Sequence, residues 1–130
     1  MKSELLVICD SQAGYAKKLA GYFRKKACHY EIQVFTDSSV FLAAAEQMTV
    51  KALLIGEDIF EILRNEKKTE KLQAEKLLVL TERRDYKQKE KEEAVYKYQS
   101  GEAILYCLVN EGLEAAEINK EKGFLNRTEM

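Results

Sequence analysis

The sequence predicts an α/β fold of three layers, with helices on both faces of a five-stranded parallel sheet. Three observations support this prediction. Short runs of apolar, largely branched side chains recur along the chain, they alternate with stretches of helical periodicity, and each run ends at a polar residue or a glycine. A strand buried on both faces reads as a continuous apolar run, and strands that alternate with helices are typical of parallel sheets.

The predicted strands are short. Leu5–Cys9 is predicted as a central strand because it is wholly apolar, and Glu31–Phe35 as a strand nearer the edge because polar and apolar residues alternate there. Five strands joined by right-handed crossovers favour the order 2-1-3-4-5 of flavodoxin-like folds. The other predicted strands cover residues 52–55, 77–80 and 95–98.

Helices are predicted between and after these strands. Residues 12–28 place Tyr15, Leu19 and Phe23 on one face, which is the spacing of a buried helical stripe. Side chains that accept hydrogen bonds from free backbone amides stand before each helix, so we expect them to act as caps. The other predicted helices cover residues 40–48, 59–63 and 101–113, and the expected caps are Asp10 or Ser11, a residue of Thr36–Ser39, Asp58 and Ser100.

The segment between the last two strands, Glu82–Glu93, is almost entirely charged. A crossover between parallel strands needs at least about 10–12 residues including its helix, so this connection is at the lower limit. We therefore expect a shortened fourth helix or an irregular loop, and we expect it to be mobile. Residues 1–113 are predicted to form one domain, followed by a polar tail or linker over residues 114–130.

The composition excludes several classes of partner. The chain has 130 residues, 46% of them hydrophobic and 33% charged, and its formal net charge is −1. This balance gives no general attraction to nucleic acid, and no apolar run approaches the ~20 residues that span a bilayer. The amino terminus lacks the pattern of a secretory signal peptide, so we expect a cytoplasmic protein. The three cysteines stand among apolar residues without C-x-x-C spacing, which predicts buried free thiols.

Polar residues follow the predicted strands where open α/β sheets place their functional crevice. Carboxylates, a hydroxyl and a lysine together suit a divalent cation and a phosphoryl group. Asp10, Glu57 and Asp58 supply acids for Mg²⁺, Thr81 supplies a hydroxyl that donates to a phosphoryl oxygen, and Lys97 neutralises charge. No G-x-x-x-x-G-K-[ST] or G-x-G-x-x-G motif is present, so nucleotide binding lacks its phosphate-binding loop. The candidate site residues are Asp10, Gly56, Glu57, Asp58, Thr81 and Lys97.

The turn Lys97-Tyr98-Gln99-Ser100-Gly101-Glu102, with Asp10 and Thr81, resembles the receiver domain of two-component response regulators. The resemblance covers about residues 4–112, and the turn corresponds to the receiver Lys-Pro-Phe-Ser-x-Glu segment. It implies that a working site would bind Mg²⁺ beside a phospho-acceptor aspartate.

The same resemblance shows where this chain departs from the family. Gly56 occupies the position of the phospho-acceptor, and Glu57 and Asp58 follow one and two residues later. The second acid after the first strand would stand at Ser11 or Cys9, and neither is a carboxylate. Proline is absent from the lysine turn, so the usual cis peptide bond is not expected there. These departures predict a degenerate site with no catalytic residue, no metal and no cofactor.

A second resemblance is to the atypical receiver-like domain at the amino terminus of pilus-assembly ATPases related to MinD and ParA. It rests on Asp10-Ser11-x-x-x-Tyr15-Ala16-x-x-Leu19-Ala20-x-Tyr22-Phe23 and on Tyr96-Lys97-Tyr98-Gln99-Ser100-x-Glu102. It implies a role in placing the protein at the cell pole and in assembly contacts. The expected partners are proteins, either a second copy of the chain or a fused or associated ATPase domain, with no nucleic acid and no membrane insertion.

The leading hypothesis is a non-catalytic receiver-like module for protein interaction and localisation that is not phosphorylated. Under this hypothesis, Asp10 caps a helix and forms a residual ion pair with Lys97. Asp58 caps the third helix, and Thr81 is a capping hydroxyl or a switch. The alternative is an atypical phosphorelay receiver phosphorylated on Asp58, with Mg²⁺ held by Asp10 and Asp58. A flavin-binding or enzymatic flavodoxin-like protein is disfavoured, because residues 11–15 offer few hydroxyls and glycines for a phosphate loop.

Overall fold

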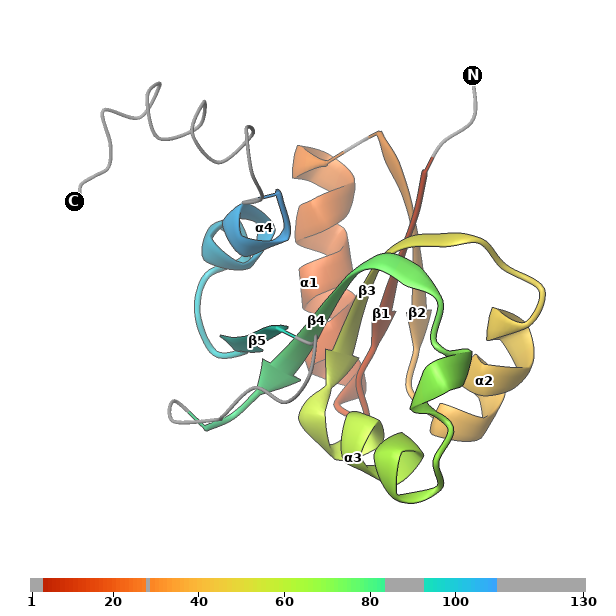
Figure 1. Cartoon of the computed structure of the whole chain (residues 1–130). Coiled ribbons are helices and arrows are strands. Elements are labelled where there is room, and N and C mark those ends of the chain that lie inside the picture. The colour runs from red at the N-terminus through yellow and green to blue at the C-terminus, as the bar shows by residue number, and fades with distance from the viewer. Residues whose placement is uncertain (1–3, 28, 84–92, 110–130) are drawn as a thin grey trace.

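A parallel sheet of five strands lies at the centre of the molecule, in the order β2-β1-β3-β4-β5 (Figure 1). The computed structural model describes residues 4–27, 29–83 and 93–109. The sheet confirms the predicted flavodoxin-like architecture and strand order. Its strands are β1 (Glu4–Cys9), β2 (Tyr30–Phe35), β3 (Val50–Gly56), β4 (Ala74–Thr81) and β5 (Glu93–Tyr96).

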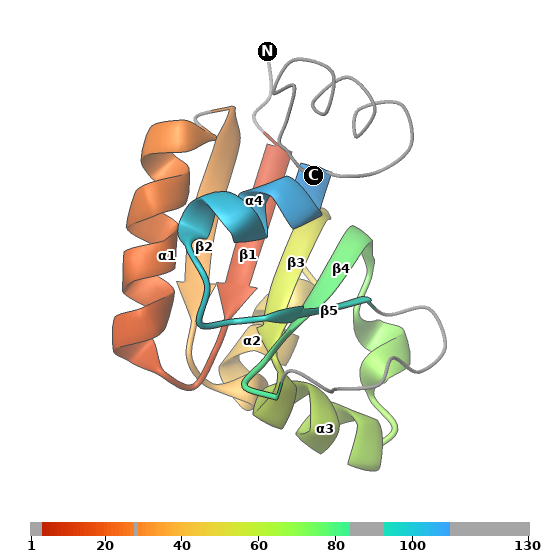
Figure 2. The same ribbon diagram turned by 90° about the vertical axis from the view of Figure 1, so that its left-hand side faces the viewer.

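Helices cover both faces of this sheet, as Figures 1 and 2 show from two sides. On one face lie α1 (Ala13–Lys26) and α4 (Gly101–Val109), and on the other lie α2 (Ser38–Ala45) and α3 (Glu57–Asn65). A 3₁₀ turn, η1 (Thr69–Lys71), precedes β4. None of the helices in the described part of the chain has both the length and the apolar character needed to cross a membrane.

Alternate residues of each central strand enter opposite cores. In β1, Leu6 and Ile8 pack against α1 and α4, whereas Val7 and Cys9 pack against the side of α2 and α3. All four side chains are fully buried. Successive strand residues point to opposite faces, so a strand covered on both sides has no polar position. This explains why the segment reads as one unbroken apolar run.

Two of the expected caps are confirmed. Asp37 accepts hydrogen bonds from the backbone amides of Ser39 and Val40 at the start of α2, at 2.8 and 3.0 Å. Ser100 accepts from the amide of Ala103 at 3.1 Å at the start of α4. Each satisfies amides that a helix leaves without an internal partner.

The expected cap of the third helix is wrong. The N-cap of α3 is Gly56, which makes no side-chain cap, and Asp58 is the second residue inside the helix. Glu57 and Asp58 place two acids in the first turn, where the helix dipole favours negative charge. The second helix also begins earlier and ends earlier than predicted, at Ser38 and Ala45. The fifth strand lies earlier than predicted, because β5 covers Glu93–Tyr96 and Lys97 follows it.

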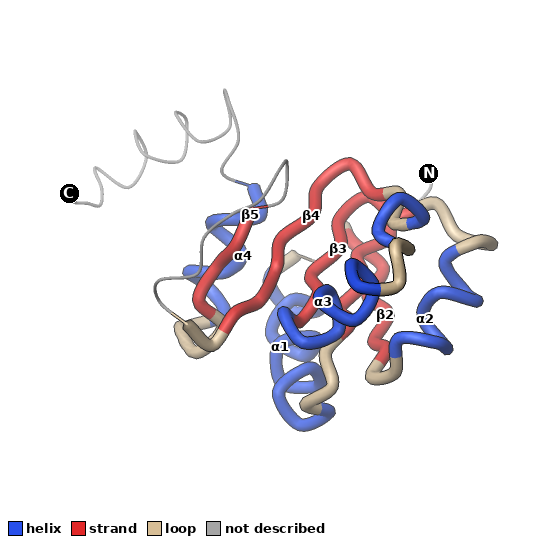
Figure 3. The backbone as a smooth tube through the Cα atoms, turned by 60° about the horizontal axis from the view of Figure 1, so that its bottom comes forward, coloured by secondary structure: helices blue, strands red, loops and turns tan. Residues whose placement is uncertain are grey.

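The carboxyl ends of the parallel strands meet at one edge of the sheet, the edge that comes forward in Figure 3. The expected shortened helix and mobile loop fall mostly on residues 84–92, and the expected tail falls on residues 114–130. Both segments lie outside the described residues, so those expectations stay predictions.

Candidate functional site

Two oppositely charged side chains are buried together at this edge. Asp10 follows β1 and is 0% exposed, and Lys97 follows β5 and is 3% exposed. The Lys97 ammonium donates to Oδ2 of Asp10 at 2.7 Å. The Lys97 amide also donates to the Thr81 carbonyl at 2.8 Å, which fixes the backbone that carries the lysine. Removing two charges from water is costly, so such a pair persists only where its geometry is good.

The rest of the Lys97 ammonium is also enclosed. It donates to Oε1 of Gln12 at 2.6 Å, and it lies 4.5 Å from the ring centroid of Tyr15 and 5.6 Å from that of Tyr98. Both rings attract a cation through their electron-rich faces. The Tyr15 hydroxyl donates to the Lys97 carbonyl at 2.9 Å, and the Tyr98 hydroxyl donates to Gln12 at 3.1 Å. Burial and the charge of Asp10 raise the pKa of Tyr15 well above its usual value.

The second carboxylate oxygen of Asp10 is also engaged. Oδ1 accepts from the backbone amide of Gln12 at 2.8 Å. Gln12 is itself the N-cap of α1, and no side chain caps that helix. The expectation that Asp10 or Ser11 caps α1 is therefore wrong, whereas the expected ion pair between Asp10 and Lys97 is present.

Gly56 leaves no room for a side chain at the point where β3 meets α3. Its backbone angles, φ −61° and ψ 145°, are ones that any residue adopts. A Cβ added here would lie 2.8 Å from Oδ2 of Asp10 and 3.1 Å from Oδ1 of Asp58. These two carboxylates flank the space in which a side chain at position 56 would begin.

Asp58 is held by its neighbours. Its Oδ2 accepts from the Ser11 hydroxyl at 2.6 Å, and its Oδ1 accepts from the Ile59 amide at 2.8 Å. Ser11 stands at one of the two positions that the receiver pattern offers for its second acid. Here it links the end of β1 to the first turn of α3.

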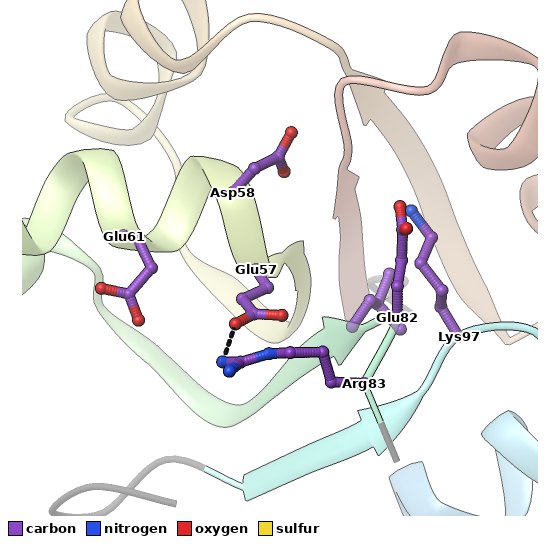
Figure 4. A pocket seen from close by; sticks show the side chains of 7 residues that line it. Glu57, Asp58, Glu61, Glu82, Arg83 and Lys97 are labelled. Atoms are coloured by element: carbon purple, nitrogen blue, oxygen red, sulfur yellow. Dashed lines mark hydrogen bonds and ion pairs between the residues drawn. The ribbon is translucent and has the colours of Figure 1, made fainter. Parts of the chain in front are cut away.

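A third group joins the ends of β3 and β4. The buried Thr81 hydroxyl donates to Oε1 of Glu57 at 2.7 Å and accepts from the Arg83 amide at 3.0 Å. The Arg83 guanidinium forms an ion pair with the other oxygen of Glu57, as Figure 4 shows. Thr81 therefore bonds a side chain and the loop that follows its strand, and whether it is a capping hydroxyl or a switch stays a prediction.

A cavity of about 380 Å³ opens beside these groups (Figure 4). Most of its charged lining is acidic, and two cations stand among the acids. The lining residues are Glu57, Asp58, Glu61, Leu80, Glu82, Arg83 and Lys97. Of the six candidate residues, Glu57, Asp58 and Lys97 line this cavity. Asp10 and Thr81 are hydrogen-bonded to the lining residues Lys97 and Glu57, and Gly56 directly precedes Glu57.

In the arrangement seen, the carboxylates of Asp10 and Asp58 are engaged by donors of the protein itself and are not presented to Mg²⁺. Mg²⁺ takes oxygen ligands in near-octahedral geometry at about 2.0–2.1 Å, usually one or two carboxylates completed by water and phosphate oxygens. Both oxygens of Asp10 already accept hydrogen bonds, one of them from an ammonium, and both oxygens of Asp58 accept as well. Within residues 4–27, 29–83 and 93–109, no group of three or more His, Cys, Asp or Glu side chains converges on a common point.

Cys9 lies directly before Asp10 and is a buried free thiol, as predicted. Burial, reinforced by the nearby carboxylates, raises its pKa to about 12. Such a thiol is a poor nucleophile because little of it is ionised near neutral pH. Cys107 forms no disulfide within the described part of the chain and is only half-buried, and Cys28 lies outside the described residues.

The sequence did not identify the residues that close the site. Gln12, Tyr15, Tyr98, Ser11 and Arg83 each contact a candidate residue, yet none belonged to the predicted group. Tyr15 reads as part of the buried stripe of α1. Tyr98 gave the clearest signal, because an aromatic residue directly after the lysine replaces the proline of the receiver turn.

Comparison with protein-family models and with curated proteins finds no match. Solved structures do match. A response regulator protein from Burkholderia pseudomallei, with a phosphorylated aspartic acid, a calcium ion and citrate, aligns with a TM-score of 0.62 at 16% identity. The alignment covers 96% of this chain and 76% of that one.

A second match comes from the phosphorylated P1 domain of CheA3 in complex with CheY6 from R. sphaeroides. It has a TM-score of 0.52 at 18% identity and covers 91% of this chain and 94% of that one. At such identities the likeness concerns the fold. The chain therefore has the flavodoxin-like fold of response-regulator receiver domains.

Proposed function

We propose that this chain is a non-catalytic receiver-like module for protein interaction and localisation, and that it is not phosphorylated. The observation that carries the proposal is the closed pair of Asp10 and Lys97 beside Gly56. Glycine supplies no acceptor at this position, and the lysine is already neutralised by a carboxylate at 2.7 Å.

Phosphoryl uptake on an aspartate requires three things: an accessible carboxylate, a metal ion to offset the phosphoryl charge, and a free cation to stabilise the developing negative charge. Lys97 would have to leave Asp10 and Gln12 to serve as that cation. Asp10 would then need to exchange its partner for Mg²⁺. Both changes break buried hydrogen bonds before any phosphoryl group is bound, which supports a silent site.

An interaction role agrees with the fold and with one neighbour, whose structure is a complex with a protein partner. We further propose that the chain is related to the amino-terminal domains of pilus-assembly ATPases related to MinD and ParA. The motifs from Asp10 to Phe23 and from Tyr96 to Glu102 support this relation. In that setting the module works in the cytoplasm, with a fused or associated ATPase domain as one partner.

One observation favours the alternative receiver phosphorylated on Asp58. Asp58 is exposed and lines the same cavity as Lys97. The two functions differ in a measurable way. The full chain is incubated with acetyl phosphate and Mg²⁺, and its intact mass is then measured by mass spectrometry. The proposal predicts the unmodified mass, for the native chain and for Asp58→Asn alike.

A stoichiometric gain of one phosphate that Asp58→Asn abolishes would establish the phosphorelay receiver instead. A gain that survives in Asp58→Asn and is lost in Glu57→Gln would place the phosphate on the neighbouring acid. Either result overturns the proposed silent site.

A further inference from the structure

The exposed face of α1 is strongly basic and has a glycine at its centre. The helix contains five basic residues and no acidic residue. Residues three and four positions away are the nearest neighbours on a helix surface. For Gly21 these neighbours are Lys17, Lys18, Arg24 and Lys25, and all four are exposed. Gly21 therefore leaves a gap in the side-chain layer, and four cations surround it.

Nothing inside the described part of the molecule explains this glycine. A Cβ added to Gly21 would meet no atom within 4 Å, whereas one added to Gly101 would lie 2.7 Å from the Tyr22 ring. A glycine inside a helix costs about 1 kcal/mol relative to alanine. Among the described residues, no ion pair involves Lys17, Lys18 or Lys25. Gly21 weakens the helix, and the lysines around it have no ion-pair partner among the described residues. Both features suit contact with another molecule.

A complementary surface lies on α3. Ile62 is a large apolar side chain and is 45% exposed. Its neighbours four positions away are Asp58 and Glu66, and Asn65 is three positions away; all three are exposed. Ile62 thus lies between two acids on the exposed face of α3; Glu66 also pairs with Lys68 at 3.1 Å, and Asp58 accepts from Ser11.

The two surfaces lie on opposite sides of the sheet, since α1 covers one face and α3 the other (Figures 1 and 2). They cannot meet within one molecule. They can meet between two copies, where an apolar side chain enters a gap and acids face cations. Helices pack in this way, with the side chains of one filling the gaps of the other.

We propose that this chain binds a second copy of itself, with Ile62 of one copy seated over Gly21 of the next. The contact is heterologous, so copies join head to tail, as a closed ring where the rotation closes and as an open chain where it does not. Opposite charges orient the two helices and are screened by salt. The inference names a partner for the interaction role proposed above and rests on it, but it does not involve phosphate uptake, so the two proposals can fail separately.

The test is sedimentation velocity of the full chain at low salt, from low micromolar to near-millimolar concentration. The average mass should rise past that of a dimer and fall back when salt is added. Lys18→Glu/Lys25→Glu and, separately, Ile62→Asp should each weaken association by about tenfold or more. Gly21→Gln should weaken association while raising thermal stability, because it fills the gap and favours the helix.

Matched controls are Val40→Asp, which replaces another exposed apolar residue (59% exposed), and Lys71→Glu, which reverses an exposed charge outside α1. Both should associate as the native chain does. The deciding sample mixes Lys18→Glu/Lys25→Glu with Ile62→Asp. Each variant retains one intact surface, so the mixture should form a one-to-one dimer and nothing longer. A native chain that stays monomeric, or a mixture that forms no dimer, overturns the proposal.

Discussion

Lys97 donates to Asp10 across 2.7 Å in an ion pair whose side chains are 4% and 0% exposed, although 87 residues separate them in the chain. The pair joins the end of the central strand β1 to the segment that follows the edge strand β5. It uses Lys97 and Asp10, the cation and one of the acids that the receiver resemblance assigns to the site. The same contact therefore stabilises the fold and occupies the site.

Replacing Lys97 by methionine should destabilise the protein by about 3–5 kcal/mol, because the change leaves Asp10 buried without its counter-charge. The double variant Lys97→Met/Asp10→Asn should lose less than the sum of the two single variants, since it leaves no buried charge unpaired. Urea unfolding at neutral pH measures both values. A loss below about 1 kcal/mol in Lys97→Met would mean that the pair is not buried in solution.

Gly56→Ala should destabilise the protein by about 1–3 kcal/mol, because the new Cβ would lie 2.8 Å from Oδ2 of Asp10 and force that carboxylate to move. Gly14→Ala is the matched control. A Cβ at Gly14 meets nothing within 4 Å, so alanine should stabilise α1 by about 0.5–1 kcal/mol. Thermal unfolding of the two variants should show shifts of opposite sign, and a stabilising Gly56→Ala would contradict the closed site.

Thr81→Val should cost about 1–3 kcal/mol, because valine keeps the shape and removes the hydroxyl that bonds Glu57 and the Arg83 amide. Thr36→Val, at an exposed position before α2, is the control and should change stability by less than about 0.5 kcal/mol. Denaturant titration compares them. Equal losses of stability in the two variants would show that the hydrogen bonds of Thr81 contribute no more than those of an exposed hydroxyl.

Alkaline pH should weaken the fold. Burial, together with the neighbouring carboxylates, raises the pKa of Cys9 from 9.0 to about 12. Above about pH 9 the unfolded chain therefore loses a proton that the folded chain keeps, so stability falls as the pH rises, by up to ~1.4 kcal/mol per unit. The raised pKa of Tyr15 acts in the same direction above its ordinary value of 10.0.

The corresponding measurement is the urea midpoint at a series of pH values between about 8 and 11. Cys9→Ala should flatten the decline, and below about pH 9 it should show no pH-dependent difference from the native chain. An unchanged slope in Cys9→Ala would show that this thiol ionises equally in both states.

The fold was largely predictable from the sequence, for a physical reason. A strand buried on both faces can be recognised in the sequence as an unbroken apolar run. Asp37 and Ser100 mark helix starts, because a carboxylate or hydroxyl there can reach backbone amides two or three residues away. Asp58 carries the same signal but misled the prediction. The strand continues to Gly56, and the chain enters the helix there without a side-chain cap.

The closure of the site was less predictable. That Lys97 and Asp10 would meet follows from the parallel sheet, which brings strand ends together. The contacts of Gln12 and Tyr15 with the lysine, and of Tyr98 with Gln12, depend on side-chain rotamers and on segments more than 80 residues apart. No local pattern encodes such contacts. They appear only once the helix α1 is placed against the end of β5.

The most direct test of the closed site is a titration of the full chain with Mg²⁺ followed by beryllofluoride, observed through the backbone amide signals of residues 10–12, 56–58 and 97. Because Asp10 is held by Lys97 and Gln12, we predict no saturable change at these signals with either addition. A saturable shift centred on Asp10 and Asp58 that grows on adding beryllofluoride would contradict the account, since it would show a carboxylate pair free to bind a metal ion and a phosphoryl mimic.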